Sequence, residues 1–182
     1  MIRTRVGYAG GTSANPTYRR IGDHMETIQI DYDPRRITYT RLLQLFFSGH
    51  NPTWPSPIRQ YASAIFYHDG EQERLAKGAM KEVGEKYGKK ISTELLPYSG
   101  FTRAEDYHQK YYLRNTAALM DQYRDRFLNE DVFTDSTAVM RVNGYIGGNG
   151  TTEQLEREEA ELGISTAAAE ALRGILKKAG KK

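Results

Sequence analysis

The chain has 182 residues and a mass of 20.7 kDa, with 38% hydrophobic and 27% charged residues. It carries 26 Lys and Arg against 23 Asp and Glu, so its formal net charge is +3. These values indicate a globular chain, exclude an obviously disordered protein, and favour one domain, or one domain with an appendage, over two independent domains. The apolar runs are far shorter than the roughly 20 residues of a membrane helix, and the first residues resemble no signal peptide. We therefore expect a cytoplasmic protein that has no membrane partner.

Cysteine is absent from all 182 residues. Its absence excludes disulfides, thiolate zinc sites, iron–sulfur clusters and a cysteine nucleophile within this sequence. The sequence pI is near 9.0, but the basic pairs are scattered along the chain and have acidic residues close by. Such pairs are typical of a solvated surface, so we expect no nucleic-acid partner.

The first part of the chain alternates strand and helix patterns. Residues 3–8 alternate weakly and end in a glycine-rich loop, and residues 26–32 alternate cleanly between apolar and polar side chains. This second pattern predicts a half-buried strand. Thr38 is a suitable cap for a helix that runs to Phe47, and the segment 50–57 contains three prolines, which predict an irregular loop.

The pattern continues with a strand over 61–68 and a helix from Asp69 to Tyr87, which Gly88 should end. A third strand is expected over 90–97. Thr102 and Glu105 have capping-box spacing, which predicts a further helix there. That helix would carry four ring-bearing residues: Tyr107, His108, Tyr111 and Tyr112.

The C-terminal part of the chain differs from the first part in its hydrophobic pattern. Residues 116–150 show little periodicity, whereas 152–162 and 166–178 each predict a helix. The whole order predicts an α+β fold, a two-layer sandwich in which helices pack on a small mixed sheet, plus a C-terminal helical extension. We expect the main domain to span residues 1–115 and the extension to span residues 116–182.

Glu26 is the most informative single residue for chemistry. Its position in the alternating segment gives it the parity of Ile28, Ile30 and Tyr32, so its carboxyl would point toward the apolar side of the strand. Burial there would keep the carboxyl protonated near neutrality and make it a proton donor. Alternatively, the strand begins only at Thr27 and Glu26 is an ordinary exposed residue; parity alone leaves both readings open.

Other candidate groups are weaker when taken alone. The hydroxyls of Tyr8 and Tyr61 could act near Glu26, although each tyrosine, taken alone, is better explained as a core or surface residue. The histidines lack metal-binding spacings, so no metal site is expected, and His108 could form a site wall with Tyr111. Dinucleotide, P-loop and serine-hydrolase motifs are absent from the sequence.

Seven ordered motifs within residues 2–115 resemble those of the peptide methionine sulfoxide reductase A family. The motifs are Val6–Gly11, Asn15–Tyr18, Asp23–Glu26, Tyr32–Pro34, His50–Thr53, Arg59–Tyr67 and Ala104–Gln109. The resemblance implies an oxidoreductase that reduces the S-epimer of methionine sulfoxide, free or in proteins. It also implies that the C-terminal stretch is an extension carried by only some members.

The resemblance assigns roles to five residues of this chain. Glu26 would be the proton donor, Tyr8 and Tyr61 would bind the sulfoxide oxygen, and His108 and Tyr111 would line the substrate site. In the family a cysteine in a GCFWG motif attacks the sulfoxide sulfur and becomes a sulfenic acid, which a resolving cysteine or an external thiol, commonly thioredoxin, then reduces. No bound cofactor or metal is implied.

The sequence departs from the family pattern in the nucleophile. The GCFWG segment lies upstream of the motif at Val6–Gly11 in the family, and no counterpart or resolving cysteine occurs in these 182 residues. We expect a misplaced start, with either cysteine or selenocysteine as the missing nucleophile. A missing first strand would leave an exposed sheet edge, and hence a poorly stable or associating chain.

A second departure lies in the loop before Tyr61. The family has an aspartate shortly before its Gln-Tyr pair, and here the corresponding segment is Trp54–Ile58, so recognition of the substrate main chain is altered. Because a hydroxyl does not replace a thiolate in attack on sulfur, the chain alone should be inactive. The alternative function is a pseudoenzyme that binds oxidised methionine without reducing it; a nucleic-acid binder is the third class considered.

Overall fold

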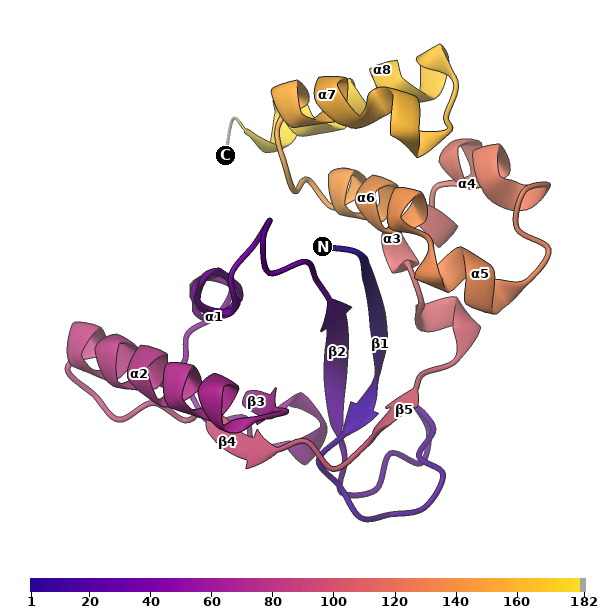
Figure 1. Ribbon diagram of the computed structural model, residues 1–182. Helices are drawn as coiled ribbons and strands as arrows, with labels where there is room; N and C mark the ends of the chain where they lie inside the picture. Colours follow the sequence, from indigo (N-terminus) through magenta and orange to yellow (C-terminus); the bar gives the residue numbers. More distant parts are fainter. Residues whose placement is uncertain (181–182) are drawn as a thin grey trace. The chain divides into compact units, whose positions relative to one another are not determined.

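The computed structural model describes residues 1–180 and has an α+β fold, as the sequence predicts (Figure 1). Its strands are β1 Arg3–Ala9, β2 Met25–Asp31, β3 Ala64–Tyr67, β4 Glu94–Pro97 and β5 Phe101–Arg103. Its α-helices are α1 Tyr39–Ser48, α2 Gly70–Tyr87, α3 Tyr111–Arg114, α4 Ala117–Arg124, α5 Glu130–Asp135, α6 Thr137–Ile146, α7 Thr152–Leu162 and α8 Thr166–Ala179.

The chain divides into two compact units, which are described separately. The first contains Val6–Ala104, and the second contains Ile2–Arg5 and the residues from Glu105 onward. Strand β1 is therefore shared between the units. The domain boundary at residue 115, which the sequence motifs suggest, stays a prediction.

The strands of the first unit form two ladders. One sheet has the order β2-β1-β5, in which β1 and β5 are antiparallel and Tyr8 lies opposite Thr102. The other ladder joins β3 and β4 in parallel, with Ile65 opposite Leu95. The strand expected over 61–68 is shorter than the sequence suggests, because Arg59–Tyr61 forms a 3-10 turn instead.

The two long helices of this unit begin and end where their caps predict. The Thr38 hydroxyl accepts the N–H of Arg41 at the start of α1, and the Asp69 carboxylate accepts the N–H of Gln72 at 2.8 Å at the start of α2. Helix α2 ends at Gly88, which has φ of 60°. The two helices pack against each other, and α2 also packs on β3; their shared core consists of Leu43, Phe47, Ile65 and Ala76.

The helix expected from Thr102 is wrong. Phe101–Arg103 is strand β5, and the Ala104 N–H extends the pairing with β1 by donating to the Val6 carbonyl at 3.0 Å. Strand pairing thus overrides the local capping signal. Asp106–His108 forms a single 3-10 turn, and α3 begins only at Tyr111.

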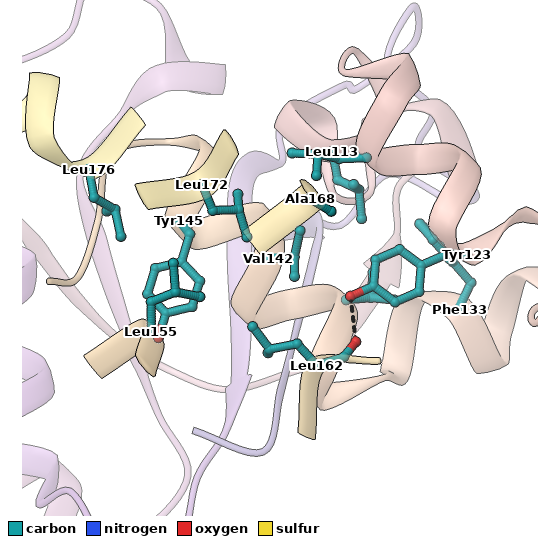
Figure 2. Packing of buried hydrophobic residues seen from close by; sticks show 12 residues of the cluster. Leu113, Tyr123, Phe133, Val142, Tyr145, Leu155, Leu162, Ala168, Leu172 and Leu176 are labelled. Carbon is teal, nitrogen blue, oxygen red and sulfur yellow. Dashed lines mark hydrogen bonds between the residues drawn. The ribbon is translucent and has the colours of Figure 1, made fainter. Parts of the chain in front are cut away.

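The second unit is helical, and the low periodicity of 116–150 hides three helices, α4 to α6. Helices of six to ten residues show too few turns for a clear period. Helices α7 and α8 confirm the prediction for the C-terminal part. Figure 2 shows the cluster that α3 to α8 bury, in which the Tyr123 hydroxyl donates to the Leu162 carbonyl at 2.8 Å.

The N-terminal residues also belong to this helical unit. The Arg5 guanidinium donates to both carboxylate oxygens of Asp135 at 2.7 Å. The Lys110 ammonium donates to the Thr4 carbonyl at 2.5 Å, from a residue with φ of 53°. Burial lowers the pKa of Lys110 to about 8. These contacts explain why Ile2–Arg5 groups with the helices.

Candidate active site in the first unit

Glu26 is part of β2, which begins at Met25, and yet it is exposed. Strand parity therefore places it correctly, whereas the expected burial of its carboxyl is wrong. The reason is that the side of β2 that it shares with Ile28 is only partly covered, since Ile28 is 56% exposed. The carboxyl has one defined partner: the side-chain amide of Gln60 donates from Nε2 to Glu26 Oε1 at 2.6 Å.

Tyr8 lies near the end of β1, the strand next to β2, and is only 2% exposed. Two residues further on, Gly10 lies in a space too small for any larger side chain. A Cβ on Gly10, which has φ of +76°, would lie 2.6 Å from Met25 Cε and 2.7 Å from Phe66 Cζ. This close approach fixes the end of β1 against the residue that precedes Glu26.

Tyr61 is 54% exposed at the end of the Arg59–Tyr61 turn, directly after Gln60. The Tyr61 N–H donates to the Ile58 carbonyl at 3.0 Å, and Arg59 forms an ion pair with Glu94 on β4. The turn packs against β2. The structure thus connects Glu26 to Gln60, the residue that precedes Tyr61.

A cavity of 330 Å³ adjoins Glu26. Its walls come from β2, α1 and β3, with Glu26, Ile28 and Ile30 along the strand and Leu42 and Phe46 on the helix. Tyr8 and Tyr61 are not among the lining residues, although their chain neighbours Ala9 and Ala62 are. The cavity thus pairs one carboxyl with largely apolar walls.

The loop that follows Tyr8 is held by hydrogen bonds to Asp23 and His24, two residues to which sequence reasoning gave no role of their own. The Asp23 carboxylate accepts the backbone N–H groups of Thr12 and Ser13 at 2.8 and 2.9 Å, as well as both hydroxyls. These hydrogen bonds hold the pKa of Asp23 far below its usual range. The motif Asp23–Glu26 was the available signal for this role.

His24 and His50 each use both ring nitrogens. His24 Nδ1 accepts the Gly11 N–H at 3.2 Å, so Nε2 carries the proton that it donates to the Ser13 carbonyl at 2.8 Å. His50 has the opposite tautomer, because Nδ1 donates to the Phe46 carbonyl at 2.9 Å and Nε2 accepts from the Ser63 hydroxyl at 3.0 Å. Each histidine side chain therefore holds neighbouring segments together through two hydrogen bonds.

The other two residues assigned by the resemblance lie in the second unit. His108 ends the 3-10 turn Asp106–His108, and its ring lies 4.2 Å from that of Tyr107. Tyr111 begins α3 and is exposed. Their relation to Glu26 stays a prediction.

Among the described residues, no group of three His, Cys, Asp or Glu side chains could hold a metal ion. None of the helices in this part of the chain has both the length and the apolar character needed to cross a membrane.

Comparison with known proteins decides the family. The sequence model described as peptide methionine sulfoxide reductase matches residues 1–138. The chain belongs to the peptide methionine sulfoxide reductase family. The match extends beyond residue 115, where the sequence motifs end.

Relatives in this reductase family come from all domains of life. The chain is 41% identical over 167 residues to a peptide methionine sulfoxide reductase of Drosophila melanogaster, covering 91% of this chain and 67% of the fly protein. It is also 41% identical to the MsrA of Sulfolobus acidocaldarius, covering 62% of this chain and 69% of the relative. The different coverage is consistent with a C-terminal extension that only some reductases carry.

Solved reductase structures share the fold. Reduced Mxr1 of Saccharomyces cerevisiae has a TM-score of 0.59 at 31% identity, over 62% of this chain and 71% of the yeast chain. Methionine sulfoxide reductase A of Corynebacterium diphtheriae has a TM-score of 0.54 at 30% identity, over 62% of this chain and 63% of the bacterial chain. The similarity therefore extends from the sequence to the backbone.

Proposed function

We propose that this chain provides the oxygen-binding and proton-donating groups of a peptide-methionine (S)-S-oxide reductase that repairs oxidised methionine. Glu26 would protonate the sulfoxide oxygen, and Tyr8 and Tyr61 would hold it through their hydroxyls. The observation that carries the proposal is the family match over residues 1–138, which includes all three residues. The placement of Glu26 beside the turn that ends in Tyr61 supports it.

The reaction needs a sulfur or selenium nucleophile, which these 182 residues do not contain. The nucleophile attacks the sulfoxide sulfur, and the oxygen leaves as the hydroxyl of a sulfenic or selenenic acid while methionine is released. A second thiol then reduces that acid to a mixed disulfide or selenosulfide and releases water. Overall, methionine sulfoxide and two thiols give methionine, a disulfide and water, and a thioredoxin-like dithiol in the cytoplasm would supply the electrons.

The cavity beside Glu26 supports methionine sulfoxide as the substrate. Its volume of 330 Å³ lies in the range of small-molecule sites, roughly 300–1,000 Å³. Its apolar walls suit the methylene chain of methionine, and Glu26 suits the polar oxygen. We include His108 and Tyr111 as further substrate-lining residues on the ground of the resemblance.

A second candidate function follows from the absence of cysteine. Without a nucleophile, the same oxygen site would make the chain a binding module for oxidised methionine. Both functions require Glu26 to recognise the sulfoxide oxygen, and they differ only in turnover.

The experiment measures binding and turnover separately. NMR titration with a methionine S-sulfoxide peptide should perturb Glu26 and Tyr61 in the chain as it stands, without methionine appearing. Joining a segment that carries the family's GCFWG motif ahead of Met1 should produce methionine in the presence of dithiothreitol. Glu26→Gln in that fusion should lower turnover by about 10²- to 10⁴-fold.

Three outcomes decide between the alternatives. A fusion that stays inactive while the chain binds the sulfoxide favours the binding module. A fusion whose turnover is unaffected by Glu26→Gln refutes the assigned proton donor. If the chain does not bind the sulfoxide peptide and the fusion is inactive, both functions are wrong.

A further inference from the structure

We propose that Gln60 is the positioning residue for the Glu26 carboxyl, and that it thereby sets the preference of the site for a sulfoxide over a thioether. This inference rests on the proposed function. Its basis is the hydrogen bond from Gln60 Nε2 to Glu26 Oε1 at 2.6 Å, which joins residues 34 positions apart. Gln60 is half-buried, whereas Glu26 is exposed.

The group that holds Glu26 is itself held in place. Gln60 is the middle residue of the Arg59–Tyr61 turn, where the Ala62 N–H donates to the Arg59 carbonyl at 3.0 Å. Arg59 is paired with Glu94, whose backbone N–H donates to the Ser63 carbonyl at 2.9 Å. Both sides of the turn are therefore fixed to β4, so the Gln60 amide can act as a fixed reference for a mobile carboxyl.

The chemistry of an amide suits this role better than that of a cation. A carboxylate only accepts hydrogen bonds, so the NH₂ end of Gln60 must face Oε1. This bond restricts the carboxyl torsion and leaves the second oxygen, Oε2, to carry the proton that the acid donates to the sulfoxide oxygen. A lysine or arginine at position 60 would strongly favour the ionised carboxylate and oppose its use as a proton donor, whereas a neutral amide orients it without adding a charge.

The same turn links the two groups that meet the substrate. Tyr61 follows Gln60 directly, so a movement of the turn would shift the phenol and the carboxyl together. A single anchored segment thus sets the spacing between a hydroxyl donor and the acid. Positioning of this kind improves recognition of the oxygen and has little effect on the apolar part of the ligand.

The test compares two ligands that differ by one oxygen. Binding of N-acetyl-L-methionine methylamide S-sulfoxide and of its parent thioether is measured by NMR titration of the full chain. Gln60→Met keeps the size of the side chain and removes the donor. We expect it to weaken sulfoxide binding by roughly tenfold to 150-fold, the effect of one hydrogen bond to a charged group, and to leave thioether binding unchanged.

Two further variants complete the experiment. Gln44→Met makes the same exchange on α1, where Gln44 accepts a hydrogen bond from Arg41 and does not line the cavity, and it should change neither affinity. Glu26→Gln should lower sulfoxide binding, and adding Gln60→Met to it should have no further effect, because the two residues act as one unit.

The outcomes separate this inference from the proposed function. If the unmodified chain binds both ligands equally, the proposed function is wrong and the role of Gln60 falls with it. If the chain prefers the sulfoxide and Gln60→Met keeps that preference, only the inference about Gln60 is overturned. Equal weakening of both ligands by Gln60→Met would assign Gln60 a merely structural role and would also overturn the inference.

Discussion

Replacing Gly10 by alanine should lower the stability of the first unit strongly. Gly10 has φ of +76°, which costs a residue with a Cβ about 1–2 kcal/mol. The new methyl would also lie 2.6 Å from Met25 Cε and 2.7 Å from Phe66 Cζ. Met25 is only 1% exposed and cannot move into solvent, so overpacking adds about 1–3 kcal/mol. The expected loss is about 2–5 kcal/mol.

The assay is urea unfolding followed by far-UV circular dichroism, with Gly78→Ala as the matched control. Gly78 lies within α2, and a Cβ there would meet nothing within 4 Å. The same exchange should therefore stabilise the chain by up to about 1 kcal/mol. A Gly10→Ala chain within about 0.5 kcal/mol of the unmodified one would show that the loop adapts and that the steric argument is wrong.

Three further substitutions test the electrostatic and hydrogen-bond arguments. Asp23 has a depressed pKa in the folded chain, so its stabilising effect is present near neutrality and is lost in acid; Asp23→Asn should flatten the decline of the urea midpoint at low pH. Lys110 titrates near pH 8 when folded and near 10.5 when unfolded, so stability should rise with pH between these values, and Lys110→Met should remove that rise. Tyr123→Phe should destabilise the helical unit by about 1–3 kcal/mol in thermal unfolding, because the Leu162 carbonyl loses its buried donor; an unchanged midpoint would count against that bond.

The helices and strands that the sequence predicts well are marked by residues within or next to them, such as helix caps. Helix α1 follows Thr38 and helix α2 lies between Asp69 and Gly88, because capping hydrogen bonds involve residues only a few positions apart. Strand β2 matches its alternating pattern within one residue. Strand β5 was missed because its pairing partner, β1, lies more than ninety residues away, and no local pattern carries that information.

The candidate site shows the same limit. The parity of Glu26 could be derived from neighbouring residues, but its exposure depends on what covers β2, which is a tertiary property. Tyr8 and Tyr61 were assigned by resemblance alone. The Gln60 contact joins two separate motifs and had no sequence signal of its own, so only the structure could supply it.

The opposite tautomers of His24 and His50 make these residues natural reporters on the loops around the site. Imidazole is acylated when the lone pair of its unprotonated nitrogen attacks the reagent, and in both rings that lone pair already accepts a hydrogen bond from the protein. Modification must then wait for the segment to open, so its rate measures how often each loop detaches. The modification rate of His24 would report the opening of the glycine-rich turn, and that of His50 would report the opening of the segment at the end of α1.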